Sequence, residues 1–228
     1  MLKKLSLFIL LAMAGGLTLG YYYWRQLTQV PQWYAAQETQ SEPVFDPANV
    51  ANLRANQSEI IQKVEQQLDE PNTEAQLNEQ EVNRLIVTRI AEKPEGQKLL
   101  TAVRGINTNI EQDKLEIGAI VNAQNFNNSR LDESEKMALA KAVEEFPFLK
   151  NQEIYIGLES KPQVQNGRIE IDRNAKVEVG ELSFTIQEVA ARLGISAEQL
   201  VDKINQNLDV LPTSEIQLKT EGLLLKPE

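Results

Sequence analysis

Cysteine and histidine are both absent from the 228 residues of this chain. Their absence excludes disulfides, cysteine nucleophiles, zinc sites built from cysteine and histidine, and any mechanism that needs an imidazole base. The hydrophobic (42%) and charged (25%) fractions are those of a globular chain and argue against a disordered or coiled-coil protein. The length allows one medium-sized domain with an appendage, or two small domains.

Charged residues are also missing from Leu5 to Trp24, a mostly apolar run near the N-terminus. About 20 helical residues at about 1.5 Å each span the roughly 30 Å hydrocarbon core of a bilayer. The run ends in aromatic residues, whose amphipathic rings favour the headgroup layer. These membrane-interface residues are Tyr21, Tyr22, Tyr23 and Trp24. We therefore predict that residues 1–25 form a cytoplasmic tip and a transmembrane signal anchor.

The distribution of cations sets the topology of this anchor. Lys3 and Lys4 precede the span, whereas Arg25 is the one nearby cation after it. The positive-inside rule places the N-terminus in the cytoplasm and everything after Arg25 on the outer side of the membrane. An alternative is a cleaved signal peptide, since Ala12-Met13-Ala14 offers a cleavage site after Ala14. We favour the uncleaved anchor because the apolar run has the full spanning length.

Acidic residues dominate the exported part. Residues 1–25 hold three of the 23 basic side chains and none of the 33 acidic ones, which leaves 20 against 33 and a net charge of −13. A surface of this sign repels nucleic acid, so we expect no nucleic-acid partner. We expect no cofactor either, because no P-loop or other cofactor motif occurs.

Residues 26–55 contain three prolines, many glutamines and no sustained hydrophobic period. This composition is typical of an extended stalk, which here would join the anchor to an exported domain at residues 56–228. Within the stalk, Val30, Trp33 and Tyr34 either rest on the membrane surface or pack locally, and the sequence supports both readings.

Hydrophobic periodicity switches between helical and strand patterns through the exported domain. Apolar residues three and four apart predict helices, and strict alternation predicts an antiparallel meander with one apolar and one charged face. Asn78, Thr185 and Ser196 are expected helix N-caps, and Asn166-Gly167 predicts a tight hairpin. The expected helices cover residues 56–70, 79–90, 133–146, 186–193 and 197–208, and the expected strands 106–110, 114–123, 154–158, 169–171, 177–184 and 216–225. The predicted fold class is α+β, preceded by a transmembrane helix.

A local motif lies near the C-terminus. Its residues are Phe184-Thr185-Ile186, Ala190, Leu193-Gly194-Ile195-Ser196, Leu200 and Asn205. They resemble the helical half of a LysM module, the peptidoglycan-binding unit built as strand–helix–helix–strand. The leading Gly-Asp-Thr turn of that family is missing, since Glu181-Leu182-Ser183 stands in its place. A DNA-binding helix-turn-helix has similar spacing, but Glu198 and Asp202 give the expected recognition helix the wrong sign for phosphate.

A wider pattern covers the whole exported domain. It consists of Leu77–Ile86, Ile154-Tyr155-Ile156-Gly157, Pro162, Gly167–Ile171, Val179–Leu182, a helical pair and a closing hairpin over residues 216–225. In order and spacing, this pattern resembles the YpmS-type bacterial membrane-anchored proteins and, more distantly, tubular lipid-binding (TULIP-like) domains. The resemblance implies a curved antiparallel sheet that wraps several amphipathic helices and leaves an apolar groove for lipid chains.

The apolar faces of the predicted helices are the candidates for lining such a groove. They either fill a closed core against the sheet or stay apart and line a lipid slot, and both readings stay open. The candidate lining residues are Val82, Leu85, Ile86, Ile90, Val189, Leu193, Leu200, Ile204 and Leu208.

Catalytic and metal-binding motifs such as G-x-S-x-G, S-x-x-K and EF-hand spacing are missing, so we expect neither an enzyme nor a metal site. Acidic pairs such as Glu79 and Glu81 lie at expected helix ends, where carboxylates cap helices, although a carboxylate-dependent hydrolase would also use such pairs. We expect a non-catalytic, membrane-anchored envelope protein that binds lipid or another hydrophobic ligand, or serves as an accessory subunit. The alternative is a cell-wall or protein-interaction module without a ligand pocket.

Overall fold

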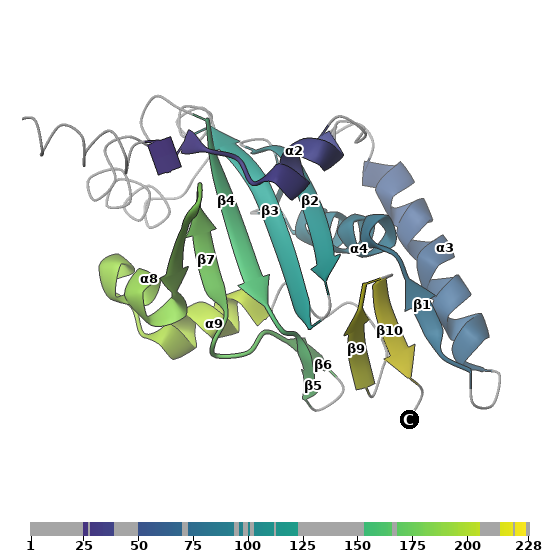
Figure 1. Cartoon of the computed structure of the whole chain (residues 1–228). Helices are drawn as coiled ribbons and strands as arrows, with labels where there is room; N and C mark the ends of the chain where they lie inside the picture. The colour runs from purple at the N-terminus through teal and green to yellow at the C-terminus, as the bar shows by residue number, and fades with distance from the viewer. Residues whose placement is uncertain are drawn as a thin grey trace, which may run out of the picture.

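The computed structural model describes residues 25–26, 28–38, 50–69, 73–93, 96–97, 100, 103–111, 113–122, 153–165, 168–205, 215–220 and 222–226. Its helices are α2 (Gln32–Glu38), α3 (Val50–Leu68), α4 (Glu79–Ala91), α8 (Ile186–Leu193) and α9 (Ala197–Asn205). Its strands are β1 (Ala75–Leu77), β2 (Val103–Glu111), β3 (Lys114–Asn122), β4 (Glu153–Ser160), β5 (Gln163–Gln165), β6 (Arg168–Glu170), β7 (Lys176–Val179), β8 (Leu182–Thr185), β9 (Glu215–Lys219) and β10 (Gly222–Lys226). The prediction of an α+β fold with antiparallel sheets is confirmed (Figure 1).

Three predicted features lie outside the described residues. They are the anchor with its aromatic end (Tyr21 to Trp24), the helix expected after Asp132, and Leu208. Among the helices that the structure does describe, none has the length and apolar character to cross a bilayer.

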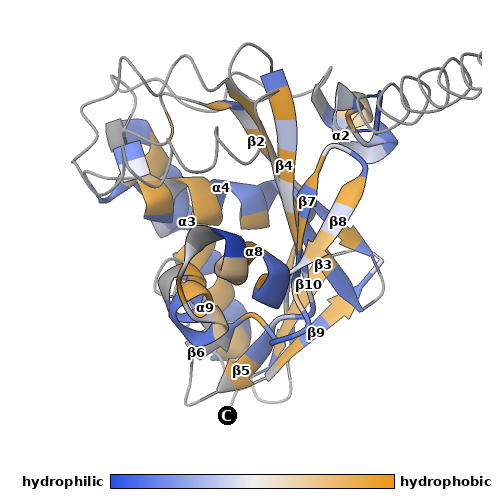
Figure 2. Ribbon diagram, turned by 90° about the vertical axis from the view of Figure 1, so that its left-hand side faces the viewer, coloured by the Kyte–Doolittle hydropathy of each residue, from blue (hydrophilic) through white to orange (hydrophobic). Residues whose placement is uncertain are grey.

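The main sheet has five strands in the order β2-β3-β4-β7-β8, each antiparallel to its neighbours. We call the face that carries Glu116 and Tyr155 the front face, and the face that carries Leu115 and Ile117 the back face. Helices α4, α8 and α9 lie against the back face, whereas α2 lies across the front face (Figures 1 and 2). Helices therefore contact both faces of the sheet.

The predicted alternation of apolar and charged faces holds for only part of this sheet. On the front face, Lys114 and Glu159 follow the predicted charged pattern, but Ile120 and Tyr155 are apolar and almost fully buried. The burial of both faces explains why neighbouring residues Ile154 and Tyr155 are each only 1% exposed. In a meander with one solvent-exposed face, one of these two neighbouring residues would be buried and the other exposed.

The second sheet has three strands in the order β1-β10-β9 and contains the predicted closing hairpin. Leu77, Leu223 and Leu225 from this sheet are buried together with residues of α3 and α4. Ile110 and Leu115, from the joined ends of β2 and β3, belong to the same cluster. This core therefore joins the small sheet to one end of the main sheet.

Local sequence rules account for the helix ends. Asn78 and Glu81 form a reciprocal capping box at α4, and Thr185 and Glu188 form one at α8. Gly194 ends α8 in the left-handed conformation, with φ at 71°, which only glycine adopts without strain. The predicted hairpin is also confirmed, because β5 pairs with β6 on either side of residues 166–167.

The segment predicted as an extended stalk differs from that prediction. It contains α2, which starts directly after Pro31, and α3 begins at Val50 rather than at Asn56. Tyr34 of α2 is 1% exposed and Trp33 is half-buried, so these residues pack locally and are not laid out on a membrane. This segment folds onto the domain because the front face offers aromatic and carboxylate partners for Trp33 and Tyr34. Such tertiary contacts cannot be read from the composition of the segment.

Candidate functional site

The front face holds a tyrosine lying flat on the sheet. Tyr155 covers two glycines of its own and the neighbouring strand, Gly157 and Gly118, which are paired across β3 and β4. A Cβ atom on either glycine would overlap the Tyr155 ring. Glycine is therefore required at both positions because the ring approaches the backbone closely, and the ring in turn covers strand backbone that a side chain would otherwise protect.

Two aromatic rings of α2, those of Trp33 and Tyr34, pack against this tyrosine. The ring centroids of Trp33 and Tyr34 lie 5.5 Å apart, those of Tyr34 and Tyr155 5.4 Å, and those of Trp33 and Tyr155 6.2 Å. All three pairs are edge-to-face, the arrangement that aromatic quadrupoles favour. The hydroxyl of Tyr34 also donates a hydrogen bond of 2.9 Å to the carbonyl of Gly105. These contacts hold α2 on β2, β3 and β4.

Glu116 is the polar centre of the same contact. Its side chain is buried, and its Oε1 accepts hydrogen bonds of 2.8 Å from both Trp33 Nε1 and the Tyr155 hydroxyl. The Nζ of Lys114 lies 3.4 Å from Oε2. A buried carboxylate needs such partners to offset the loss of hydration. We call Trp33, Glu116, Tyr155, Glu178 and Lys114 the Glu116 cluster.

The two acids Glu178 and Tyr155 of the Glu116 cluster both have a raised pKa. Burial raises the pKa of Glu178 to about 8, with further contributions from its hydrogen bond to Glu116 and from the negative charge of Glu116. Burial also raises the pKa of Tyr155 well above its ordinary value, and the charge of Glu116 adds to this effect. Two neighbouring carboxyls cannot both ionise at low cost, so the proximity of Glu116 favours the protonated form of Glu178.

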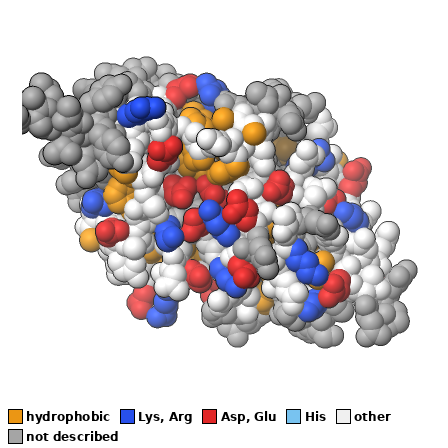
Figure 3. All heavy atoms as spheres, viewed as in Figure 1, with side chains coloured by type: hydrophobic (Ala, Val, Ile, Leu, Met, Phe, Trp, Pro, Cys, Tyr) orange, Lys and Arg blue, Asp and Glu red, His pale blue; other side chains and the backbone are white. Residues whose placement is uncertain are grey.

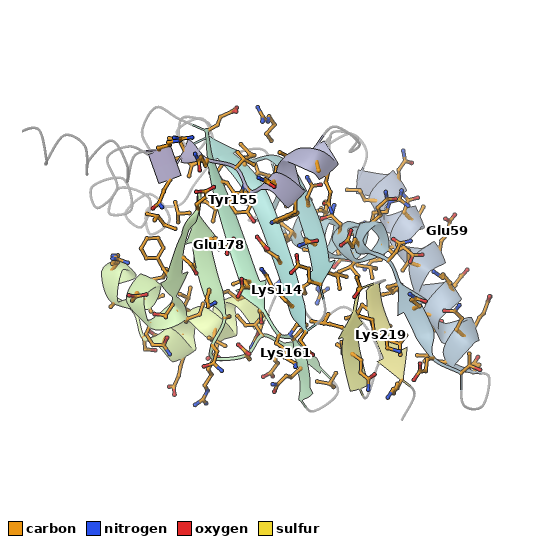
Figure 4. The ribbon with its side chains drawn as sticks, viewed as in Figure 1. Glu59, Lys114, Tyr155, Lys161, Glu178 and Lys219 are labelled. Carbon is orange, nitrogen blue, oxygen red and sulfur yellow. The ribbon has the colours of Figure 1, made fainter. Side chains whose placement is uncertain are left out.

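An exposed set of charges surrounds the cluster (Figure 3). Lys114 and Lys176 lie 3.0 and 3.1 Å from the two carboxylate oxygens of Glu159. Burial alone would raise the pKa of Glu159, but the hydrogen bonds and charges of the two lysines outweigh it and lower that pKa. Figure 4 shows Lys114, Tyr155 and Glu178 on three neighbouring strands of the front face. This outer part is a solvated ion-pair network.

The cluster has the elements of a carboxyl pair but not the access that catalysis requires. Glu116 is only 3% exposed, and its Oε1 is already occupied by Trp33 and Tyr155. Among the described residues, no group of acidic side chains is arranged to hold a metal ion. The contacts of the Glu116 cluster therefore attach α2 to the main sheet.

The chain just before α2 is held as well. The backbone N–H of Glu181, in the turn between β7 and β8, donates a hydrogen bond of 2.8 Å to the carbonyl of Gln26. The hydroxyl of Thr28 donates to the carbonyl of Arg25 at 3.2 Å. The chain is thus in contact with the main sheet at Gln26, six residues before α2 begins.

A separate cleft lies between the two sheets. Its volume is about 790 Å³, within the range of ligand-binding clefts. One wall is formed by consecutive residues of β9 and its turn, and the other by Asp113, just before β3, and by Lys161 and Pro162, just after β4. The residues that line it are Asp113, Lys161, Pro162, Ile216, Gln217, Leu218, Lys219 and Thr220.

The residues predicted to line a lipid groove fall into two separate parts of the core. Val82, Leu85 and Ile86 are buried in the cluster beneath the small sheet, with Ile90 packed against it. Leu200 and Ile204 pack against a second cluster, around Ile186. Val189 is half-buried, Leu208 and the Leu193 side chain lie outside the described residues, and none of the predicted residues lines the cleft.

The acidic pair at the start of α4 has structural partners. Glu79 accepts a hydrogen bond of 2.8 Å from the backbone N–H of Ile110, and Glu81 completes the capping box and pairs with Lys63 at 2.7 Å. These bonds join α4 to β2 and α3, in keeping with the predicted role of carboxylates at helix ends.

Neither the Glu116 cluster nor the cleft was predicted from the sequence. One pattern could have indicated the cluster: Glu116-x-Gly118 and Tyr155-x-Gly157 each put a polar or aromatic side chain two residues from a glycine on one strand face. To know that Glu116 and Tyr155 lie close together, however, one needs the register in which β3 and β4 pair.

Comparison of the chain with family models, with curated proteins and with solved structures finds no match.

Proposed function

We propose that this chain is a non-catalytic, single-pass membrane protein of the bacterial envelope whose extracytoplasmic α+β domain acts by binding. The observation that supports this most directly is the docking of Gln26 and of α2 on the main sheet, which begins immediately after the predicted anchor. A domain joined by a loose stalk would be free to move away from the membrane. Here the segment after the anchor is part of the domain.

The short connection limits how far the domain can stand from the bilayer. The predicted span ends at Trp24, and Gln26 is already hydrogen-bonded to the turn between β7 and β8. Two extended residues reach at most about 7 Å. The β7–β8 end of the main sheet therefore stands at the membrane surface in this proposal. The small sheet, whose strand β9 lines the cleft, lies at the other end of the main sheet (Figure 1).

The ligand that fits the helix-covered face of the sheet is apolar. Ala119, Val121, Ile156 and Val179 project from this back face and are only half-buried, while Ile106 and Ile154 beside them are buried. Apolar side chains that keep part of their surface open favour contact with lipid chains or a hydrophobic partner. The resemblance to lipid-binding domains agrees with this choice.

The cell-wall alternative has less support. A LysM unit places its two helices between two strands of one module. Here β8, which precedes α8 and α9, belongs to the main sheet, whereas β9, which follows them, belongs to the small sheet. We therefore propose binding of an apolar ligand ahead of binding to peptidoglycan.

Two experiments test this function. Protease added to intact spheroplasts should digest the C-terminal domain, and protection of the domain would refute the topology. Native mass spectrometry of the full chain, extracted from membranes in mild detergent, should detect a co-purified lipid. Val121→Thr and Val179→Thr keep the side-chain shape but add a hydroxyl and should lower lipid occupancy, whereas Val30→Thr on the opposite side should not. Absence of bound lipid from all of these proteins would refute the ligand.

A further inference from the structure

Strand β9 is the edge of the small sheet, and the cleft runs along it. The sheet order is β1-β10-β9, so β9 is paired within this sheet on one side. Five consecutive residues, Ile216 to Thr220, line the cleft on the other side. An accessible edge strand is a template for a further strand, and proteins usually protect such edges.

The register of the hairpin sets which backbone groups face the cleft. Lys219 and Gly222 are partners across the two-residue turn, and Gln217 is the partner of Leu224. The closing pair of a two-residue hairpin is hydrogen-bonded, and hydrogen-bonded and non-hydrogen-bonded pairs then alternate along the ladder. The backbone N–H and C=O groups of Ile216 and Leu218 therefore point away from β10 and toward the cleft.

The side chains around the cleft combine apolar and basic character. Pro162, Ile216 and Leu218 form the apolar part of the lining; Leu218 is itself buried in the core beneath the small sheet, and Ile216 packs against that core. Lys161 and Lys219 supply positive charge (Figure 4). Asp113 lines the same cleft, but its carboxylate is paired with Lys161 at 2.8 Å. The lining thus has a net positive charge in a chain whose net charge is −10. A ligand that carries carboxylates is favoured here over a cationic one.

The shape of the cleft favours one added strand over a second copy of the chain. Asp113, Lys161 and Pro162 form a wall that faces β9, and β5 also approaches β9. A single extended segment can enter such a cleft, whereas the edge of another folded sheet would meet the opposite wall. The acidic net charge of the chain also disfavours self-association at this point.

We propose that β9 binds an extended, acidic segment of a partner protein by strand addition. The segment would exchange backbone hydrogen bonds with Ile216 and Leu218, place apolar side chains toward Pro162 and the core side of the sheet, and place carboxylates near Lys161 and Lys219. This mode takes affinity from the backbone and specificity from alternate side chains. The proposed strand addition depends on the proposed function in one respect, the location of the partner protein, which would be in the envelope.

The test uses full-length protein in nanodiscs and fluorescence anisotropy. The probes are fluorescent peptides of about six residues. The first alternates valine and glutamate, the second has the same sequence with N-methyl groups on alternate backbone nitrogens, and the third replaces glutamate by lysine. The first peptide should bind. Each lost backbone hydrogen bond should weaken binding about two- to tenfold, so the N-methylated peptide should bind much more weakly.

Variants of β9 separate backbone pairing from side-chain contact. Ile216→Pro removes a backbone N–H that points to the cleft, and an edge strand tolerates proline at such a position. This variant should bind the first peptide about two- to tenfold more weakly than the matched control Ile216→Ala. Lys219→Glu should weaken binding of the glutamate peptide and strengthen binding of the lysine peptide. Circular dichroism of each variant checks that the fold is retained.

Each remaining outcome overturns the proposal. It fails if the glutamate peptide does not bind, if N-methylation has no effect, or if Ile216→Pro and Ile216→Ala bind equally. A concentration-dependent dimer that Ile216→Pro abolishes would identify a second copy as the occupant instead. Incorporation into nanodiscs and lipid occupancy are read separately, so failure of the membrane or lipid proposals is distinguishable from failure at β9.

Discussion

Replacing Trp33 by phenylalanine measures how firmly α2 is held on the main sheet. The substitution keeps an aromatic ring against Tyr34 and Tyr155 but removes the Nε1–H that donates to Glu116 at 2.8 Å. A hydrogen bond to a charged group contributes about 1.5–3 kcal/mol. Glu116 keeps its bond from Tyr155, and Trp33 is only half-buried, so water replaces part of the loss. We expect α2 to be destabilised by about 1–2 kcal/mol.

Hydrogen exchange of the full-length protein measures this effect locally. A change of about 1–2 kcal/mol corresponds to about 5- to 30-fold faster exchange of the α2 amides, while the central strands β3 and β4 keep their protection. Trp33→Ala should have a larger effect because it also removes two ring contacts, each worth about 0.5–1.5 kcal/mol. Gln32→Ala, at an exposed position of the same helix, is the matched control and should change little.

Two results would refute this reasoning. If α2 exchanges at the same rate in Trp33→Phe and in the unchanged protein, the bond to Glu116 does not hold the helix. If exchange becomes faster throughout β3 and β4 as well, docking of α2 is not a local event but part of the global folding of the sheet.

Three further predictions concern the same sheet and its neighbouring helices. The pKa of Glu178, about 8, lies above its value in the unfolded chain, so stability is fully present below about pH 4.5 and falls as the pH rises to about 8. Because Glu178 is half-buried, we expect a loss of about 1–2 kcal/mol, which Glu178→Gln should abolish in urea titrations between pH 5 and 8. Gly118→Ala or Gly157→Ala should cost about 1–3 kcal/mol by displacing the Tyr155 ring, with altered ring NMR signals; unchanged ring signals would contradict the close approach. Gly194→Ala should lower the melting temperature by the equivalent of about 1–2 kcal/mol, and Gly194→Asn by less; equal effects would argue against the left-handed cap.

Features set by a few neighbouring residues were predicted well from the sequence. The N-caps at Asn78 and Thr185, the end of α8 at Leu193 and the hairpin at residues 166–167 each depend on residues within four positions of one another. Their physics is local, so the sequence pattern carries it. The strand β1 was missed because three residues are too short for a periodic pattern.

Contacts between distant segments were not predictable in the same way. Trp33 and Glu116 are 83 positions apart, and the composition around Trp33, rich in proline and glutamine, favoured an extended stalk. The cleft likewise depends on how the small sheet lies beside the ends of β3 and β4. For the groove, helical periodicity identified which faces are apolar, but not that α4 and α9 would bury them in different clusters.

The attachment of α2 to the main sheet also determines where a recombinant fragment of this domain can begin. A fragment that begins at Val50 would lose Trp33 and Tyr34, and with them the cover over Tyr155 and Ile120. Tyr155 and Ile120, which are almost fully buried in the intact domain, would then form an exposed hydrophobic patch. The Glu116 carboxylate would also lose its hydrogen bond from Trp33. Recombinant fragments of the domain should therefore include Val30 and α2, since fragments that start after this helix are expected to aggregate.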